Sequence, residues 1–179
     1  MARAFLQRME HPTAIAGATE TDPAPISFDE FFLAERDGLF GALWLVTRNR
    51  HEAEEIAQDA FLKVWERWGR VEGMADPSGY LYRTAMNLWR SRGRRAALAL
   101  RKVVHAAPQE YDMRAVEERD VVMRALSRLT PRQRAAIVLV DLLGLTSDAA
   151  GKALGVRPST VRVLAARART VVREGMEER

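Results

Sequence analysis

The first half of the chain carries apolar residues at intervals of three and four, the spacing typical of amphipathic helices. Ser27 is a typical N-cap, and the apolar positions after it predict one helix, or two with a bend near Gly38. A second pattern predicts a helix over residues 52–68 that ends at Gly69. Its apolar stripe consists of Ala53, Ile56, Ala57, Ala60, Phe61, Val64, Trp65 and Trp68.

A third helix is expected to begin at Asp76 and Pro77, an N-cap followed by proline at the first helical position. Together these helices predict a helical domain over residues 27–95. Residues 1–26 hold three prolines among small and polar residues, and we expect them to form a mobile leader. Residues 96–114 carry no continuous apolar face and predict a flexible linker.

The second half, residues 115–179, predicts a second small helical domain. AVEERDVVMRALSRL has a helical pattern, and the Thr-Pro pair at 130–131 repeats the cap and proline of a helix start. Thr146 is expected to cap a short helix, and Gly155 to make the turn into a longer last one. The expected fold class is therefore all-α, with two small helical domains joined by a flexible linker.

Charge is distributed unevenly, although the formal net charge is only +4. No acidic residue lies between Asp76 and Glu110 or between Asp148 and Glu174, and both intervals are rich in arginine. Two separate basic segments are typical of a protein that contacts a polyanion at two places. Two solvated helix faces are the simpler alternative, but they must account for two long acid-free intervals in a chain with 24 acidic residues.

Composition excludes several classes of protein. Hydrophobic residues at 47% and charged residues at 29% are typical of a folded globular chain. No apolar run reaches the ~18 residues of a membrane span, and the first residues lack the apolar core of a signal peptide, so we expect a cytoplasmic protein without membrane insertion. The chain has no cysteine and only three scattered histidines, so no metal or cofactor is expected.

The last two predicted helices have the arrangement of a helix-turn-helix: a short helix, a glycine turn and a longer basic helix. Six positions fit its core: Ala150, Gly151, Leu154, Val156, Val161 and Leu164. The outward side of the last helix carries hydrogen-bond donors suited to a major groove. These donors are Ser159, Thr160, Arg162, Arg167, Arg169 and Arg173. A helical hairpin with solvated arginines is the alternative, and the six core positions favour DNA binding over it.

Two helices of the first domain carry polar faces. On the helix over 52–68, the side opposite the apolar stripe holds Glu55, Gln58, Asp59, Leu62 and Glu66. A leucine within an acidic patch indicates a protein partner. Single exposed leucines are common, however, and spacing alone favours neither interpretation.

The helix that begins at Pro77 has a second polar arc, which holds Tyr80, Arg83, Asn87, Arg90 and Arg94. It combines an aromatic ring for base stacking, arginines for phosphates and an amide that can read an exposed base edge. This arc indicates a nucleic-acid face, and a solvated basic helix is the alternative.

Taken together, these segments resemble the extracytoplasmic-function (ECF) sigma factors of bacterial RNA polymerase. HEAEEIAQDAFLKVWERW resembles the segment with which that family binds the polymerase clamp. DPSGYLYRTAMNLWRSRGRR resembles its segment for promoter melting and minus-10 recognition, and RALSRLTPRQRAAIVLVDLLGLTSDAAGKALGVRPSTVRVLAARAR resembles its minus-35 domain. The three occur in the family's order and leave only the leader and the linker unmatched.

The resemblance implies sigma region 2 for the first domain and sigma region 4 for the second. It implies core RNA polymerase and promoter DNA, both duplex and melted, as partners, with an anti-sigma factor as a further one. It assigns Gln58 and Asp59 to polymerase binding, Asn87 to minus-10 recognition, and the loop over residues 69–76 to a flipped base.

Combined with the polar faces, the resemblance predicts three binding sites. The predicted polymerase-binding residues are Glu55, Gln58, Asp59 and Leu62. The predicted minus-10 residues are Tyr80, Arg83, Asn87 and Arg90. The predicted minus-35 residues are Arg157, Ser159, Thr160, Arg162, Arg167 and Arg169.

The chain departs from the family pattern at three places. Tyr80 stands where many members have tryptophan, Ala149-Ala150 replaces a common Glu-Ile pair, and Val163-Leu164 replaces a common Ser-Arg pair. The first change preserves stacking. The other two remove polar contacts that the family often makes. The mode of binding to the minus-35 element is therefore still expected, but the DNA sequence that this chain reads there is not predicted.

Our interpretation is a promoter-specificity subunit that docks on core polymerase and has no catalytic residues. The alternative is a stand-alone helix-turn-helix regulator that acts without polymerase docking, and it leaves the face around Leu62 and the face around Asn87 without a role. A nucleic-acid enzyme is a third class, but the acid-free segments deny it metal-binding carboxylates near the basic faces.

Overall fold

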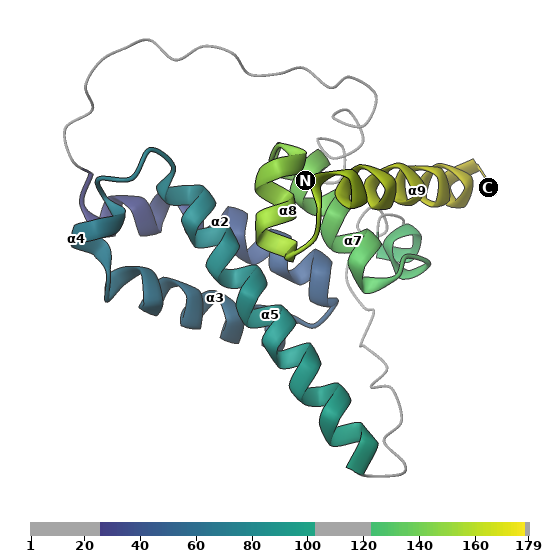
Figure 1. Cartoon of the computed structure of the whole chain (residues 1–179), viewed down its shortest axis with the longest axis horizontal. Coiled ribbons are helices and arrows are strands. Elements are labelled where there is room, and N and C mark those ends of the chain that lie inside the picture. The colour runs from purple at the N-terminus through teal and green to yellow at the C-terminus, as the bar shows by residue number, and fades with distance from the viewer. Residues whose placement is uncertain (1–25, 103–122, 178–179) are drawn as a thin grey trace.

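Every regular element in the described residues, 26–102 and 123–177, is helical in the computed structural model of the chain (Figure 1). The expected all-α fold of two small helical domains is confirmed. The first domain contains α2 (Phe28–Thr47), α3 (Arg50–Trp65), α4 (Trp68–Val71) and α5 (Pro77–Lys102). The second contains α7 (Pro131–Ile137), the π-helical turn η1 (Val138–Leu142), α8 (Ser147–Leu154) and α9 (Pro158–Glu177).

Helix starts follow from local hydrogen bonds that the sequence encodes. The Ser27 hydroxyl accepts the backbone N–H of Glu30, whose carboxylate accepts the N–H of Ser27, a complete capping box. Thr130 and Gln133 form the same box before α7. Thr146 caps α8, and Asp76 accepts the N–H of Gly79 at 2.7 Å. The starts predicted at Ser27, Asp76, Thr130 and Thr146 are therefore confirmed, whereas the helix expected from residue 52 begins at Arg50, after the N-cap Asn49.

Helix ends differ from the expectations. α3 ends at Trp65, and Gly69 lies inside the short helix α4. The prediction that the helix over residues 52–68 ends at Gly69 is therefore wrong. The backbone N–H of Arg67 bonds to the carbonyl of Val64, three residues back, which tightens the last turn before Gly69 is reached. α5 continues to Lys102, past the predicted domain boundary at residue 95.

The predicted helix from Pro131 to Leu143 changes its winding along its length. Its last turn is the π-helical η1, in which the N–H of Leu143 bonds to the carbonyl of Val138, five residues back. Before it, residues 123–127 are helical, while the start of the AVEERDVVMRALSRL helix lies outside the described residues. Residues 1–25 of the predicted leader and residues 103–114 of the predicted linker lie outside them as well.

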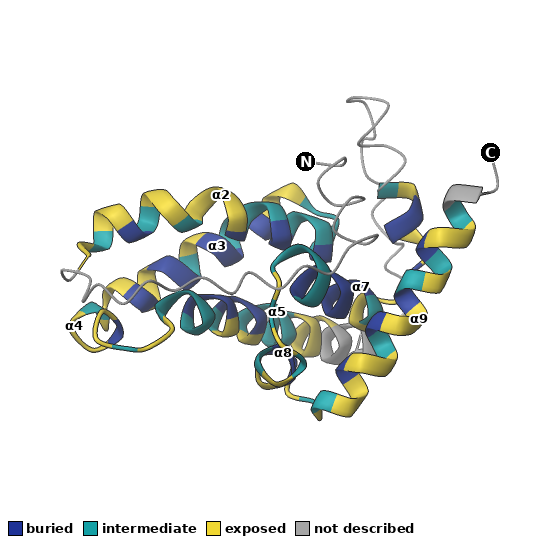
Figure 2. Cartoon of the chain, turned by 90° about the horizontal axis from the view of Figure 1, so that it is seen from above, coloured by how far each residue is buried: buried dark blue, intermediate teal, exposed yellow. Residues whose placement is uncertain are grey.

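Aromatic rings join α2, α3 and α4. Trp68 packs against Phe28 and Phe31 with ring centroids 5.4 and 5.0 Å apart, and Phe32 packs on Phe61 at 4.8 Å. α3 packs on both α2 and α5, while α7 and α8 pack on α9. Figure 2 shows that the buried residues of these helices face inward and the exposed ones outward. None of the described helices is long and apolar enough to cross a membrane.

Candidate protein and nucleic-acid interfaces

The acidic side of α3 is tied to α5 through Arg92. Its guanidinium donates to Glu55 and, at 2.8 Å, to the Asp59 carboxylate. The hydrogen bond with Glu55 raises the pKa of Arg92. Because both carboxylates are about half exposed, they anchor α3 to α5 while they still face solvent. Spacing along the sequence did not indicate Arg92, because the pair joins residues more than thirty positions apart.

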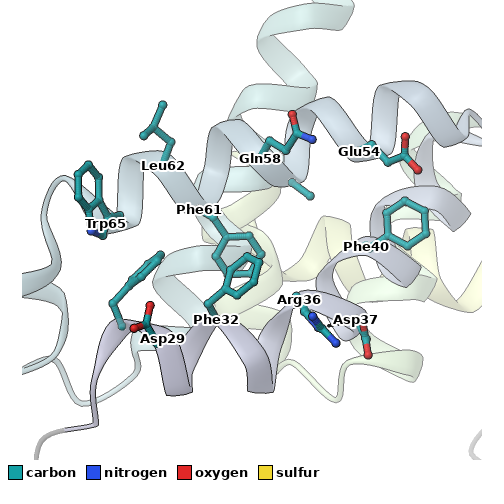
Figure 3. Close-up of a pocket in the computed structure, with 12 residues that line it drawn as sticks. Asp29, Phe32, Arg36, Asp37, Phe40, Glu54, Gln58, Phe61, Leu62 and Trp65 are labelled. Atoms are coloured by element: carbon teal, nitrogen blue, oxygen red, sulfur yellow. Dashed lines mark ion pairs between the residues drawn. The ribbon is translucent and has the colours of Figure 1, made fainter.

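A groove of about 620 Å³ runs between α2 and α3, beside this acidic side (Figure 3). It is lined by Phe28, Asp29, Phe32, Arg36, Asp37, Phe40, Glu54, Ala57, Gln58, Phe61, Leu62 and Trp65. Gln58 and Leu62, both predicted for polymerase binding, therefore belong to this groove, whereas Glu55 and Asp59 lie on the side of α3 that faces Arg92.

Two large apolar side chains project from the α3 side of the groove. Leu62 is 52% exposed, as the sequence indicated, and Trp65 is 59% exposed. The prediction that Trp65 belongs to the apolar stripe that packs into the core is therefore wrong. One turn of helix separates the two, so they form a single exposed apolar rim in place of an isolated leucine.

The polar arc of α5 is organised around the Tyr80 ring. The Tyr80 hydroxyl accepts a hydrogen bond from Arg67 at 3.1 Å, and this bond raises the pKa of Arg67. The Arg83 guanidinium lies over the same ring, 5.3 Å from its centroid. Asn87 is exposed two turns further along the helix. Arg67 was not indicated by the sequence, because it lies in the turn after α3.

Arg90 differs from the other residues of this arc. Its guanidinium donates to the Asn87 side chain at 3.3 Å and to the backbone carbonyl of Ala153, in α8, at 3.4 Å. The structure therefore brings Tyr80, Arg83 and Asn87 together on one open face, and it directs Arg90 toward the second domain.

The helix-turn-helix is formed as predicted by α8, a glycine turn and α9. Gly155 has a φ of +63°, which favours glycine in the turn. A Cβ at Gly151 would lie 2.9 Å from the carbonyl oxygen of Val156, so only glycine permits this close crossing. Five of the six predicted minus-35 residues are exposed: Arg157, Ser159, Thr160, Arg162 and Arg167.

Arg169, the sixth predicted minus-35 residue, is engaged inside the second domain. Its guanidinium donates to both oxygens of Asp141, at 2.6 and 2.9 Å, and the hydrogen bond raises the pKa of Arg169. Asp141 is almost fully buried in η1. A bidentate pair of this kind holds α9 on η1. Val163, one of the departures from the family pattern, is half exposed on the outer side of α9.

Comparison with protein families gives two matches along the chain. Residues 31–98 match Sigma-70 region 2, and residues 119–171 match Sigma-70 region 4.

Within residues 26–102 and 123–177, no three histidine or acidic side chains cluster in a way that could hold a metal ion.

Two curated proteins are similar over most of the chain. The ECF RNA polymerase sigma factor SigM of Mycobacterium tuberculosis is 34% identical over 150 residues, which cover 80% of this chain and 74% of SigM. The ECF RNA polymerase sigma factor SigE of Mycolicibacterium smegmatis is 29% identical over 174 residues. The match covers 90% of this chain and 66% of SigE, so the chain spans about two thirds of the length of SigE.

Two solved structures share the fold. The sigma factor RpoE, solved in complex with the anti-sigma factor NepR from Bartonella quintana, has a TM-score of 0.69 at 19% identity and covers 84% of this chain and 96% of its own. CnrH, solved in complex with the cytosolic domain of CnrY, has a TM-score of 0.56 at 20% identity, with 99% and 97% covered.

Proposed function

The chain belongs to the extracytoplasmic-function sigma factors of bacterial RNA polymerase, and from this premise we propose which of its surfaces bind polymerase and which bind promoter DNA. The groove face of α2 and α3 binds core polymerase. The Tyr80 face of α5 binds the melted minus-10 strand, and α9 binds the minus-35 duplex. The observation that carries the proposal is the exposed rim of Leu62 and Trp65, because a stand-alone DNA-binding regulator has no use for it.

On the polymerase side, the rim supplies apolar area and the neighbouring polar groups supply specificity. Leu62 and Trp65 would be covered by apolar side chains of the partner, while Gln58 supplies amide hydrogen bonds. Glu55 and Asp59 flank the rim with negative charge, and Arg92 holds them in place. The matching surface on polymerase is therefore expected to be apolar at its centre and basic along one side.

At the minus-10 element, Tyr80 is a preformed stacking platform. Arg67 holds its hydroxyl and Arg83 lies over its ring, so the ring cannot turn freely when a base arrives. Asn87 lies about 10 Å further along the helix axis. Stacking on Tyr80 and edge recognition by Asn87 therefore act on different nucleotides of the exposed strand.

At the minus-35 element, the N-terminal half of α9 supplies the base-reading groups. Arg162 is exposed at the centre of that half, with Ser159 and Thr160 beside it. Arg167, further along and exposed, contacts phosphate. Because Arg169 is held by Asp141, its main role is to fix the position of α9, and its charge adds less to DNA binding than that of Arg167.

A further partner is an anti-sigma factor. RpoE, which shares the fold, was solved with the anti-sigma factor NepR. We propose that an anti-sigma factor also binds the present chain. Such a protein would compete with polymerase for the rim of Leu62 and Trp65. The chain works in the cytoplasm, beside the polymerase and the DNA, and contributes no catalytic group to transcription.

The test is transcription by core polymerase with and without the full chain on a panel of promoters. Transcription that depends on the chain is expected, and Asn87→Ala should lower it on intact promoters far more than on templates that carry a pre-melted bubble. Specific duplex binding without any binding to polymerase would favour the stand-alone regulator instead.

A further inference from the structure

Val163 is an apolar side chain that α9 exposes to solvent. It is 50% exposed, and among the described residues of the second domain no other large apolar side chain is exposed. α9 packs on α7 and α8, and its buried side consists of Val161, Ala165, Ala168 and Val172. At about 100° per residue, Val163 lies almost directly opposite this buried side. It therefore contributes little to the core of its own domain.

The side chains next to Val163 on the outward side of α9 are small and uncharged. Ser159 precedes it by one turn, and Ala166 and Thr170 follow it by one and two turns; all three are exposed. We call these four residues the central strip. None of them can form the paired hydrogen bonds by which arginine or lysine recognises guanine and asparagine or glutamine recognises adenine. Recognition of a base at the centre of α9 therefore needs other chemistry.

Positive charge lies along both edges of the central strip. Arg162 is exposed on one edge and Arg167 on the other. Arg169 does not reach across the strip, because Asp141 holds its guanidinium through two hydrogen bonds. The acid-free interval of the sequence covers the whole strip. An uncharged centre between two basic edges suits a major groove, in which base edges form the floor and phosphates form the rims.

We propose that Val163 recognises the C5-methyl group of a thymine in the minus-35 element. In the major groove of unmodified DNA, this methyl is the apolar group that a base pair presents, and the other groups donate or accept hydrogen bonds. The inference rests on the proposed function, since it needs α9 to enter the minus-35 duplex. It adds the chemical group that the centre of the helix selects.

The same side chain disfavours other bases at that place. Guanine, adenine or cytosine would bring a hydrogen-bonding group against the isopropyl group, which excludes water and offers no partner. Val163 thus favours thymine by contact and rejects the alternatives by desolvation. Arg162 is long enough to reach a neighbouring base pair from its edge of the strip. The expected element therefore has a thymine beside the base pair that Arg162 reads.

The experiment uses holoenzyme assembled from the full chain and bacterial core polymerase. A pool of duplexes randomised over both promoter elements is selected by binding to this holoenzyme, and the most enriched duplex is kept. Each thymine of its minus-35 element, on either strand, is then replaced singly by uracil, which removes the methyl group and keeps the base pair. A binding titration is made for each duplex.

Wild-type holoenzyme is expected to lose about fourfold in affinity at one position, the factor for a single methyl group removed from water. Uracil at the other thymines should have little effect. An enriched element without thymine, or one that tolerates uracil at every position, would overturn the proposal.

Two variants identify the residue that senses the methyl group. Val163→Ala should bind the enriched duplex about fourfold more weakly than wild type and should no longer distinguish uracil from thymine. Arg162→Ala is the matched control from the same helix. It should bind more weakly but keep the response to uracil, because it contacts a different base pair. A response to uracil that is equal in Val163→Ala and wild type would refute the role of Val163.

Cytosine at the responsive position separates the methyl group from the rest of thymine. Replacing the T·A pair by C·G should weaken wild-type binding, and 5-methylcytosine should recover about fourfold of it, because it restores the methyl group alone. Val163→Ala should show no recovery. Equal recovery in both proteins would show that the methyl group acts through another residue or through the shape of the DNA.

Circular dichroism checks that Val163→Ala folds, as expected for a change at a half-exposed side chain. If it does not fold, Val163→Thr, which keeps the branched shape and replaces a methyl group by a hydroxyl, takes its place with a weakened response to uracil expected. The outcomes also separate this inference from the proposed function. A holoenzyme that selects no promoter sequence would refute the proposed function, whereas sequence-dependent binding that ignores uracil would refute this inference alone.

Discussion

Trp65 and Trp68 lie three residues apart and are predicted to have opposite roles. Trp65 is 59% exposed at the rim of the groove, while the Trp68 ring packs against Phe28 and Phe31. Trp65→Ala should therefore weaken polymerase binding and leave the fold intact. Trp68→Ala should lower the stability of the first domain.

The size of each effect follows from exposed area and packing. A tryptophan offers roughly 250 Å² in total, so about 150 Å² of Trp65 is free to be covered, worth about 3–4 kcal/mol at full burial. The cost of immobilising the tryptophan side chain at the interface offsets part of this and leaves about 2–3 kcal/mol, a loss of about 30- to 150-fold in affinity for Trp65→Ala. Trp68→Ala should cost about 2–4 kcal/mol of unfolding free energy, because its ring is only partly buried.

The assay pairs thermal unfolding of each variant with a titration against core polymerase, using labelled full-length chain. Trp65→Ala is expected to unfold within about 2 °C of wild type, since its loss removes few contacts. If Trp65→Ala instead unfolds as early as Trp68→Ala and keeps wild-type affinity, Trp65 belongs to the core and the rim is not a docking surface.

Four further predictions concern single side chains. Leu62→Ala should weaken polymerase binding by about fivefold, or about 1 kcal/mol. Leu33 is slightly more exposed and lies on α2 outside the groove, so Leu33→Ala should leave the affinity unchanged in the same titration. We predict that the half-exposed Val163 contacts a thymine methyl, so replacing thymine by uracil across the minus-35 duplex should weaken wild-type binding at one position and leave Val163→Ala unaffected there. Arg162→Ala should cost about 1–3 kcal/mol at the cognate site and relax its sequence preference, and Arg167→Ala should reduce the salt slope by about one unit without changing that preference. Arg169→Ala should mainly lower the unfolding temperature, because it breaks the pair with buried Asp141. A reduced salt slope together with an unchanged unfolding temperature would show that the pair opens on DNA.

The sequence predicted those features that depend on neighbours within one turn. Ser27, Asp76, Thr130 and Thr146 each cap a helix through a bond to a backbone N–H three residues later, and such a bond involves only residues within one turn. The helix-turn-helix was predictable for a similar reason. Gly151 permits the close approach to the Val156 carbonyl and Gly155 adopts the positive φ of the turn, and both requirements involve residues nearby in the sequence.

Features that depend on how helices cross were not predictable from spacing. Trp65 lies at the edge of the apolar stripe of α3, and the angle at which α2 crosses α3 decides whether the ring is covered. Arg92 and Arg169 each find a carboxylate on another helix, 33 and 28 positions away. Hydrophobic periodicity describes one helix at a time, so it does not contain this information.

Acid-free intervals in a sequence count positive charges without saying where the charges point. In the interval after Asp76, Arg92 is paired with two carboxylates of α3, and Arg90 donates to a backbone carbonyl of α8. In the last interval, Arg169 neutralises Asp141. The number of phosphates that the free chain can engage is therefore smaller than its arginine content suggests. Because each phosphate contact adds about one unit to the salt slope of DNA binding, that slope should be smaller than the number of arginines in the two intervals.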